Sequence, residues 1–292
     1  MKKQVLLATL LAFSTIIFAQ INMSIWNKGQ QVSYPLEMVD SVTFDTNNLV
    51  QLEGIGVFSV GENKQVSFSP GNLQYNPKHK IFRFALSQLD YAEGINAIVS
   101  DNLDGWYDQF GWGTGDAPTK TTSDHNEYLT FVDWGTNIIG IAPANTWRTL
   151  TKDEWQYLIT DRTDAAQLWG VAEVDGVSGI IIPPDGWIYP VGITFVPGYS
   201  GRLITDKFSA HQTFTSEEWK MLESTNAVFL PAGGQRTISG TTEIQIYGYY
   251  WSSTPIDVNK KNAYFLTIAS AGADIGIYSR FHGYNVRLVK DK

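Results

Sequence analysis

The sequence predicts an α+β fold in which short antiparallel strands far outnumber helices. Two capping boxes, each a threonine placed three residues before a glutamate, predict helices that begin at 151–155 and 215–219. An Asp-Gly pair between two β-rich segments, 171–174 and 177–184, predicts a tight hairpin. The other apolar segments are short and are separated by glycine- and asparagine-rich turns, which is typical of strands.

Residues 1–19 are predicted to be a secretory signal peptide. Lys2 and Lys3 precede an apolar run over 5–18, and the small Ala19 offers a cleavage position. The run is shorter than the roughly 20 apolar residues of a spanning helix, and no later segment is long and apolar enough to span. We therefore expect an exported protein without a transmembrane segment, located in the periplasm, on the outer surface or secreted.

Residues 20–48 are expected to form a β leader and a linker. The pattern predicts one strand, a turn at Gly29, a second strand through Val32 and Tyr34, and a third strand that ends at Phe44. The closing run "DSVTF" resembles the end of a β element found ahead of diverse domains in secreted proteins of the Bacteroides group. The alternative is an N-terminal hairpin that packs on the main domain.

Residues 54–292 are predicted to form one main domain. Alternating apolar residues at 56–60 and 65–69 predict its first hairpin. Residues 87–143 are irregular and rich in Gly, Asp, Asn and Trp, and a loop region of that length is expected to be structured and functional. Further strands are expected at 81–86, 171–174, 177–184, within 227–236, and at 249–254, 263–268 and 286–289.

The two predicted helices each have one apolar face. Trp155, Leu158 and Ile159 share a face of the first helix. Trp219 and Leu222 share a face of the second. We expect each face to pack on a sheet, because helical spacing brings these side chains to one side.

Composition excludes several classes of function. Cysteine is absent, so the chain has no disulfide, thiolate nucleophile or thiolate metal site, and its aromatic-rich core must hold the fold. The formal net charge is -8, and removal of Lys2 and Lys3 with the signal peptide lowers it by two more. Nucleic acid and anionic lipid are disfavoured as partners because both need a basic surface. The charge is compatible with calcium, with neutral glycans, and equally with an acidic surface that serves solubility alone.

Four motifs then suggest a family: "WRTLTKDEW" at 147–155, "AVFLPAGGQR" at 227–236, "GYYWSST" at 248–254 and "GYNVRLV" at 283–289. In order and spacing they resemble the Fibrobacter succinogenes major paralogous domain and its relatives in Bacteroides-type secreted proteins, over roughly residues 54–291. Such domains are similar to the formylglycine-generating-enzyme branch of the C-type lectin-like fold. The resemblance implies two helices flanking a twisted sheet and an arginine-containing final strand that pairs near the first strand.

Two of these motifs have a structural interpretation of their own. Trp251 is expected to alternate with tyrosines across a central strand, while Ser252 and Ser253 bond to neighbouring backbone groups at its end. On the closing strand, if Val286 and Leu288 point to the core, Arg287 points the other way. It is then either solvated or paired with a carboxylate.

The resemblance does not carry the enzymatic chemistry of its relatives. Formylglycine-generating enzymes use active-site thiols, and this chain has none. Iron-dependent relatives bind metal through several histidines, but the histidines here show no ligand spacing, which indicates exposed or hydrogen-bonded side chains. The four are His79, His125, His211 and His282. No cofactor is therefore expected, and no catalytic residue is assigned.

Calcium is the one ion that the sequence accommodates. Sugar-binding C-type lectins hold calcium through acid-amide motifs, and "PPDGW" at 183–187 is the nearest match to the first of them, without a second. A different site is possible in an oxygen-rich loop, since such loops suit calcium; the alternative is an acidic turn. Its candidate ligands are Asp101, Asn102, Asp104 and Asp108.

Aromatic residues in loops are the best candidates for ligand contact. Exposed rings stack on the apolar faces of sugars or anchor protein partners, but rings in the same loops can instead fold over the sheet as core. The candidate residues are Trp106, Tyr107, Trp112, Trp134 and Trp187. The expected function is a non-catalytic binding or adhesion module for a glycan or protein ligand. The alternatives are a diverged enzyme of the formylglycine-generating superfamily and a structural envelope or appendage component.

Overall fold

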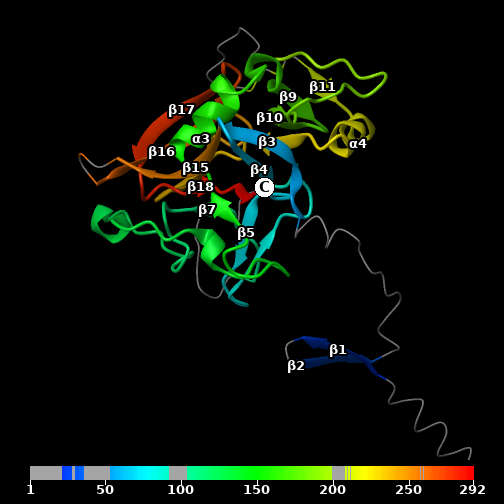
Figure 1. The fold of residues 1–292 in the computed structure, drawn as a ribbon. Coiled ribbons are helices and arrows are strands. Elements are labelled where there is room, and N and C mark those ends of the chain that lie inside the picture. The colour runs from blue at the N-terminus through cyan, green and yellow to red at the C-terminus, as the bar shows by residue number, and fades with distance from the viewer. Residues whose placement is uncertain are drawn as a thin grey trace, which may run out of the picture. The chain divides into compact units, whose positions relative to one another are not determined.

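The chain divides into two compact units, Met1–Thr46 and Asn47–Lys292. A computed structural model describes residues 22–27, 30–35, 53–91, 104–198, 208, 210, 212–256, 258 and 260–292 (Figure 1). In the first unit, β1 (Asn22–Asn27) pairs antiparallel with β2 (Gln30–Pro35), as predicted for the first two leader strands. The predicted signal peptide and third leader strand lie outside the described residues. Among the described helices, none combines the length and apolarity that a membrane crossing requires.

The second unit has the predicted mixed α+β composition, and its first and last strands share one sheet. The order of this sheet is β3-β4-β19-β8. The predicted first hairpin is present, and Val289 of the closing strand lies opposite Phe68, antiparallel. The closing strand therefore lies beside the first hairpin, as the family resemblance led us to expect. The strands are β3 (Ile55–Gly61), β4 (Lys64–Phe68), β19 (Leu288–Asp291) and β8 (Arg148–Thr149).

A five-stranded sheet, ordered β17-β16-β15-β18-β7, has the "GYYWSST" strand at its centre. Because successive side chains point to opposite faces, Tyr250 packs in one buried cluster and Trp251 in another. The Trp251 indole N–H donates to the Phe110 carbonyl at 2.7 Å, which ties this strand to the loop region. The strands are β15 (Gly248–Pro255), β16 (Asn262–Ala269), β17 (Gly272–Ser279), β18 (Tyr284–Asn285) and β7 (Gln109–Phe110).

A third sheet, ordered β11-β9-β10-β12, contains the predicted Asp-Gly hairpin. Asp175 and Gly176 have φ values of 50° and 79°. Positive φ at both central residues is the requirement of a type I′ turn, which explains the pair of residues found there. The strands are β9 (Gly170–Val174), β10 (Val177–Ile182), β11 (Thr213–Phe214) and β12 (Val228–Pro231). Two small hairpins complete the described strands: β5 (Leu73–Asn76) with β6 (Ile81–Phe84), and β13 (Gln235–Thr237) with β14 (Gly240–Thr242).

Both predicted helices are present and begin at their capping boxes. Thr151 and Glu154 exchange hydrogen bonds at the start of α3 (Lys152–Gln156), and Thr215 and Glu218 do so at α4 (Ser216–Ser224). The α3 helix continues as a π-helical turn, η5 (Tyr157–Asp161). The predicted apolar faces are buried at Trp155, Leu158, Ile159, Trp219 and Leu222. Short 3₁₀ turns are η3 (His125–Tyr128), η4 (Trp134–Thr136) and η6 (Ala165–Gln167).

Arg287 differs from the expectation. It is buried together with Val286 and Leu288, so it is not solvated. Its Nη2 donates to the Gln88 side-chain oxygen at 2.6 Å, and no carboxylate forms an ion pair with it among the described residues. The expected alternation requires a continuous strand, but Val286 and Arg287 lie in the break between β18, which ends at Asn285, and β19, and the Arg287 guanidinium there is covered by Gln88.

Candidate functional site

Three of the five aromatic residues predicted to contact a ligand belong to the core, which corrects that prediction. Tyr107, Trp112 and Trp134 are at most 1% exposed. They pack in one buried cluster with side chains of the β15–β16 region. A ring without exposed surface cannot stack on a ligand, so these residues do not form a binding face.

Hydrogen bonds and ring contacts explain why the loop tryptophans turn inward. The Trp112 indole N–H donates to the Ser252 carbonyl at 2.9 Å, and the Tyr107 hydroxyl donates to the Pro118 carbonyl. Trp134 packs on Phe110 at 5.9 Å between ring centroids. The loop region has few regular elements of its own, so its large rings supply the apolar contact that holds it on the sheet.

Trp106 is half-buried and already has a partner. The guanidinium of Arg83 lies over its ring at 3.8 Å from the centroid, a cation–π contact. One face of its ring is therefore already occupied within the protein.

The described residues do not bring together a calcium site around the predicted acidic loop. Asp101 and Asn102 lie outside the described residues. The Asp104 carboxylate pairs with Lys78 at 2.6 Å and with His79 at 3.3 Å, and the Lys78 hydrogen bond is the main cause that holds its pKa below the ordinary value. Asp108 is fully buried. In the part of the chain that the structure describes, no three acidic or histidine side chains are grouped to hold a metal.

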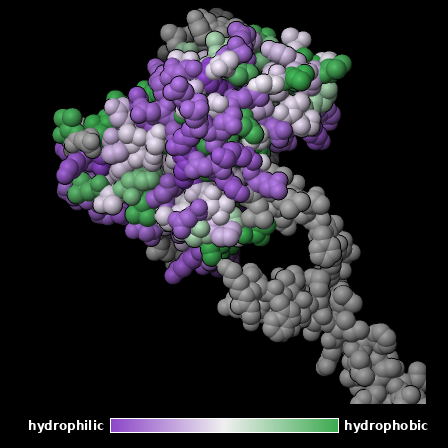
Figure 2. Space-filling view, viewed as in Figure 1, coloured by the Kyte–Doolittle hydropathy of each residue, from purple (hydrophilic) through white to green (hydrophobic). Residues whose placement is uncertain are grey.

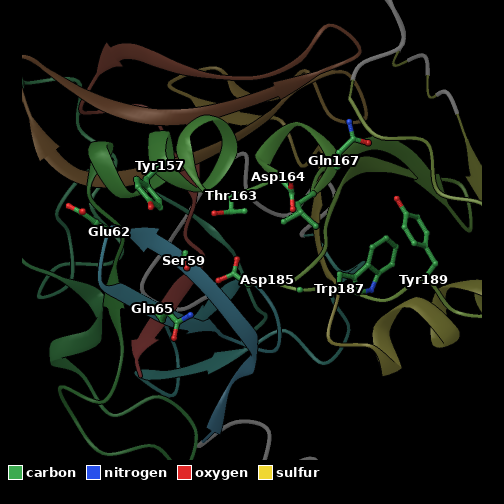
Figure 3. Close-up of a pocket in the computed structure, with 12 residues that line it drawn as sticks. Ser59, Glu62, Gln65, Tyr157, Thr163, Asp164, Gln167, Asp185, Trp187 and Tyr189 are labelled. Atoms are coloured by element: carbon green, nitrogen blue, oxygen red, sulfur yellow. The ribbon is translucent and has the colours of Figure 1, made fainter.

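Trp187 is the predicted aromatic residue that does line a cavity, a cleft of about 580 Å³ that we call the Trp187 cleft. It lies between the β3–β4 hairpin, the η5–η6 region and the loop that follows β10. Figure 3 shows Tyr157 and Glu62 at one end, Trp187 and Tyr189 at the other, and Asp185, Ser59 and Thr163 between them. Figure 2 shows mainly hydrophilic residues on the neighbouring surface of α3 and the β3–β4 hairpin.

Hydrogen bonds and ring contacts hold the aromatic end of the cleft in place. The Trp187 indole N–H donates to the Thr225 hydroxyl at 2.8 Å, and its ring packs edge-on against Phe195 at 5.2 Å. Tyr189 lies 4.6 Å from the Trp187 ring at an interplanar angle of 45°. These contacts fix the indole while leaving Tyr189 about half exposed. Gly186, with φ of 64°, turns the chain so that both rings follow the β10 strand.

Carboxylates and uncharged polar groups form the rest of the cleft. Asp185 accepts a bond from Nη1 of the buried Arg162 at 3.1 Å, and Arg162 also donates to the carbonyls of Leu168 and Pro183. Burial lowers the Arg162 pKa to about 10, which leaves the guanidinium charged at neutral pH. The other Asp185 oxygen is enclosed without a protein partner. The polar lining comprises Ser59, Glu62, Gln65, Thr163, Asp164, Gln167 and Asp185, with no basic side chain among the described lining residues.

The sequence carries a signal for this cleft that extends beyond Trp187 itself. The run "PPDGWIYP" at 183–190 places two rings two residues apart between prolines, directly after a strand. Such a loop is stiff and displays its rings at the strand end. Tyr157, Gln167 and the β3–β4 residues carry no comparable sequence signal, because only folding brings them to the same place.

Comparisons with family models, with curated proteins and with solved structures found no match to this chain.

Proposed function

We propose that this chain is an exported, non-catalytic binding module that holds a glycan in the Trp187 cleft. The observation that carries the proposal is the pair of rings, Trp187 and Tyr189, at one end of a cleft that is otherwise lined by hydroxyl, amide and carboxylate groups. Sugars present apolar C–H faces and many hydroxyls, so they need both kinds of lining. The proposed site keeps one predicted residue, Trp187, and replaces the others.

The negative charge of the cleft limits which class of glycan it can bind. The cleft has three carboxylates, Glu62, Asp164 and Asp185, and the Arg162 guanidinium beneath it compensates one of them. A sulfated or carboxylated sugar would meet like charge there. Neutral glycans, or glycans with a basic amino group, fit the cleft better.

We also propose that the second unit has a C-type lectin-like fold related to the Fibrobacter major paralogous domains. The arrangement of the closing strand beside the first hairpin and the two capped helices support this proposal. Binding in the Trp187 cleft is expected to be independent of calcium, because its aromatic and hydroxyl groups supply the contacts. Addition of EDTA should leave the affinity unchanged.

The test is a glycan array followed by calorimetry with the chain and two matched variants. Tyr189→Ala removes a cleft ring that is 47% exposed, and Tyr278→Ala removes a ring on β17 that is 50% exposed. Tyr189→Ala should weaken binding about tenfold, the usual effect of losing an aromatic contact worth about 1.4 kcal/mol. Tyr278→Ala should not change it.

Three results would contradict this function. The first is an array on which no neutral or basic glycan is retained. The second is an equal loss of affinity in Tyr189→Ala and Tyr278→Ala, which would separate binding from the cleft. The third is cleavage of the bound glycan, detected by chromatography of the ligand after incubation, which would show that the module is an enzyme.

A further inference from the structure

A second cluster of side chains lies where β13, η3 and the turn at 281–283 meet. Arg236 of β13 and Gly283 exchange two backbone hydrogen bonds, 2.9 and 2.8 Å long. The Arg236 side chain lies flat over Gly283, where a Cβ would come within 2.8 Å of its Nη2. The Phe281 ring contacts His125 at 5.0 Å and His282 at 4.7 Å. The two histidines, isolated in the sequence, thus both contact Phe281, and His282 lies close enough to Arg236 and His125 for each to affect its pKa.

The cluster contains buried nitrogens without acceptors. Arg236 is 2% exposed; its Nε donates to the Gln109 carbonyl at 3.2 Å, but its Nη2 has no partner in the described part of the chain. His125 Nδ1 is also enclosed without a partner. By contrast, Nε, Nη1 and Nη2 of the buried Arg280 all donate to backbone carbonyls. Arg162 and Arg287 also have buried nitrogens without a partner among the described residues, but at Arg236 the unpaired nitrogen belongs to a cluster that also contains the unpaired Nδ1 of His125.

The charge of Arg236 has no counter-ion among the residues that the structure describes. None of the ion pairs among the described residues involves Arg236, His125 or His282. A guanidinium cannot escape burial by losing its proton, and an uncompensated buried charge costs several kcal/mol, on the order of the penalty for one partner of a buried ion pair. An anion that accepts from Nη2 removes both the unpaired donor and the unpaired charge.

We propose that Arg236, His125 and His282 form a binding site for a tetrahedral oxyanion, the sulfate or phosphate group of an inorganic ion or of an ester. The group accepts from Arg236 Nη2 and from the histidine rings, whose partial exposure places them at the entrance. This site is separate from the Trp187 cleft and shares no residue with it. The buried Arg236 holds the group through its charge and its Nη2 donor, and the histidine rings at the entrance orient toward the bound group.

The histidines make the site pH-dependent. Burial, followed by the charges of Arg236 and His125, lowers the pKa of His282 to about 4, and its Nδ1 lies 2.8 Å from the Gln235 side-chain oxygen. The groups that face His282 are Tyr278 of β17, Tyr284 of β18, Gln235 and Arg236 of β13, and His125 of η3, with Glu243 behind Gln235. A bound oxyanion offsets the positive charge of Arg236, so it raises the His282 pKa, and by linkage the oxyanion binds more tightly as pH falls.

The experiment follows the histidine ring resonances of the full chain by NMR while sodium sulfate is added at constant ionic strength against sodium chloride. We expect the resonances of His125 and His282 to move and saturate, while His79, which pairs with Asp104, does not. The His282 pKa should rise by about one unit from its value of about 4, and sulfate affinity should therefore increase about threefold from pH 6.5 to pH 4.5. Inorganic phosphate and a sugar sulfate ester, used in parallel, distinguish a free ion from an ester as the preferred source.

Variants separate binding from folding. Arg236→Gln should weaken sulfate binding at least tenfold, because it removes a charge-assisted hydrogen bond. Since Arg236 is buried, His125→Asn is used as a second variant at the partly exposed entrance, and His79→Gln is the matched control. The site is supported if sulfate causes saturable shifts of the histidine resonances in the wild type and in His79→Gln, and if these shifts are lost in both Arg236→Gln and His125→Asn. Unchanged His125 and His282 resonances with all three anions, or shifts that persist in folded Arg236→Gln, would overturn it.

Discussion

Replacing Trp112 by alanine tests whether the loop tryptophans are core. The side chain is 1% exposed, and truncation of a buried Trp to Ala costs about 3–5 kcal/mol. The change also leaves the Ser252 carbonyl without its indole donor, about 1–2 kcal/mol, and removes the ring under the Arg280 guanidinium, 4.2 Å from the centroid, about 1 kcal/mol. Because these contributions overlap, we expect a total loss of about 5–6 kcal/mol.

The assay is thermal and urea unfolding followed by far-UV circular dichroism, which does not depend on the removed fluorophore. A loss of that size should lower the Tm by about 10–20 °C, since 1 kcal/mol corresponds to about 2–4 °C in a domain of this size. Trp112→Phe, which keeps a ring but loses the indole N–H, should lose about 1–2 kcal/mol and still fold. Trp106→Ala is the control for an incompletely buried Trp and should lose less than Trp112→Ala.

A wild-type Tm for Trp112→Ala would contradict the assignment of Trp112 to the core. Loss of glycan binding in folded Trp112→Phe, with binding retained in Tyr189→Ala, would also contradict it. That result would show that the glycan contacts the Trp112 ring and not the Trp187 cleft.

Two further predictions concern the framework of the second unit. Gly135→Ala should prevent stable folding, because the new Cβ would lie 1.8 Å from the Trp147 carbonyl oxygen, and a soluble variant with native circular dichroism would contradict this. Glu154→Gln should destabilise by about 3 kcal/mol in urea titrations, because the buried Glu154 carboxylate accepts from Arg148 at 2.8 Å and Lys64 at 2.5 Å. Burial raises the Glu154 pKa, but the bonds from Arg148 and Lys64 outweigh it and leave the pKa lowered. The wild type should therefore lose this stabilisation as pH falls below the ordinary glutamate pKa, about 4.5, and the variant should show a weaker dependence there.

Local chemistry in the sequence determined the elements of the fold. The two capping boxes, the Asp175-Gly176 turn and the alternation of the first hairpin each depend on residues near one another in the chain, and each is present as predicted. The succession of short strands was predicted in the same way, from apolar residues and turn residues that are near one another in the chain. Absence of cysteine excluded thiol chemistry without any reference to structure.

Only the tertiary structure decided which polar and aromatic residues face a ligand. Trp112 and Trp187 look alike in sequence, both in loops beside glycines, yet one lies under Arg280 in the core and the other lines a cleft. Tyr157 and Trp187 are thirty positions apart in the sequence, yet they line the same cleft. His125 and His282 are much further apart in the sequence, yet they are close in space. In both cases sheet pairing, and not sequence proximity, brings the residues together. Whether a ring is buried depends on the packed chain. The sequence around a loop aromatic residue does not decide whether the ring points to the core or to solvent, because that depends on which distant residues pack beside it. The sequence therefore determined the framework of this protein, while packing determined its two candidate sites.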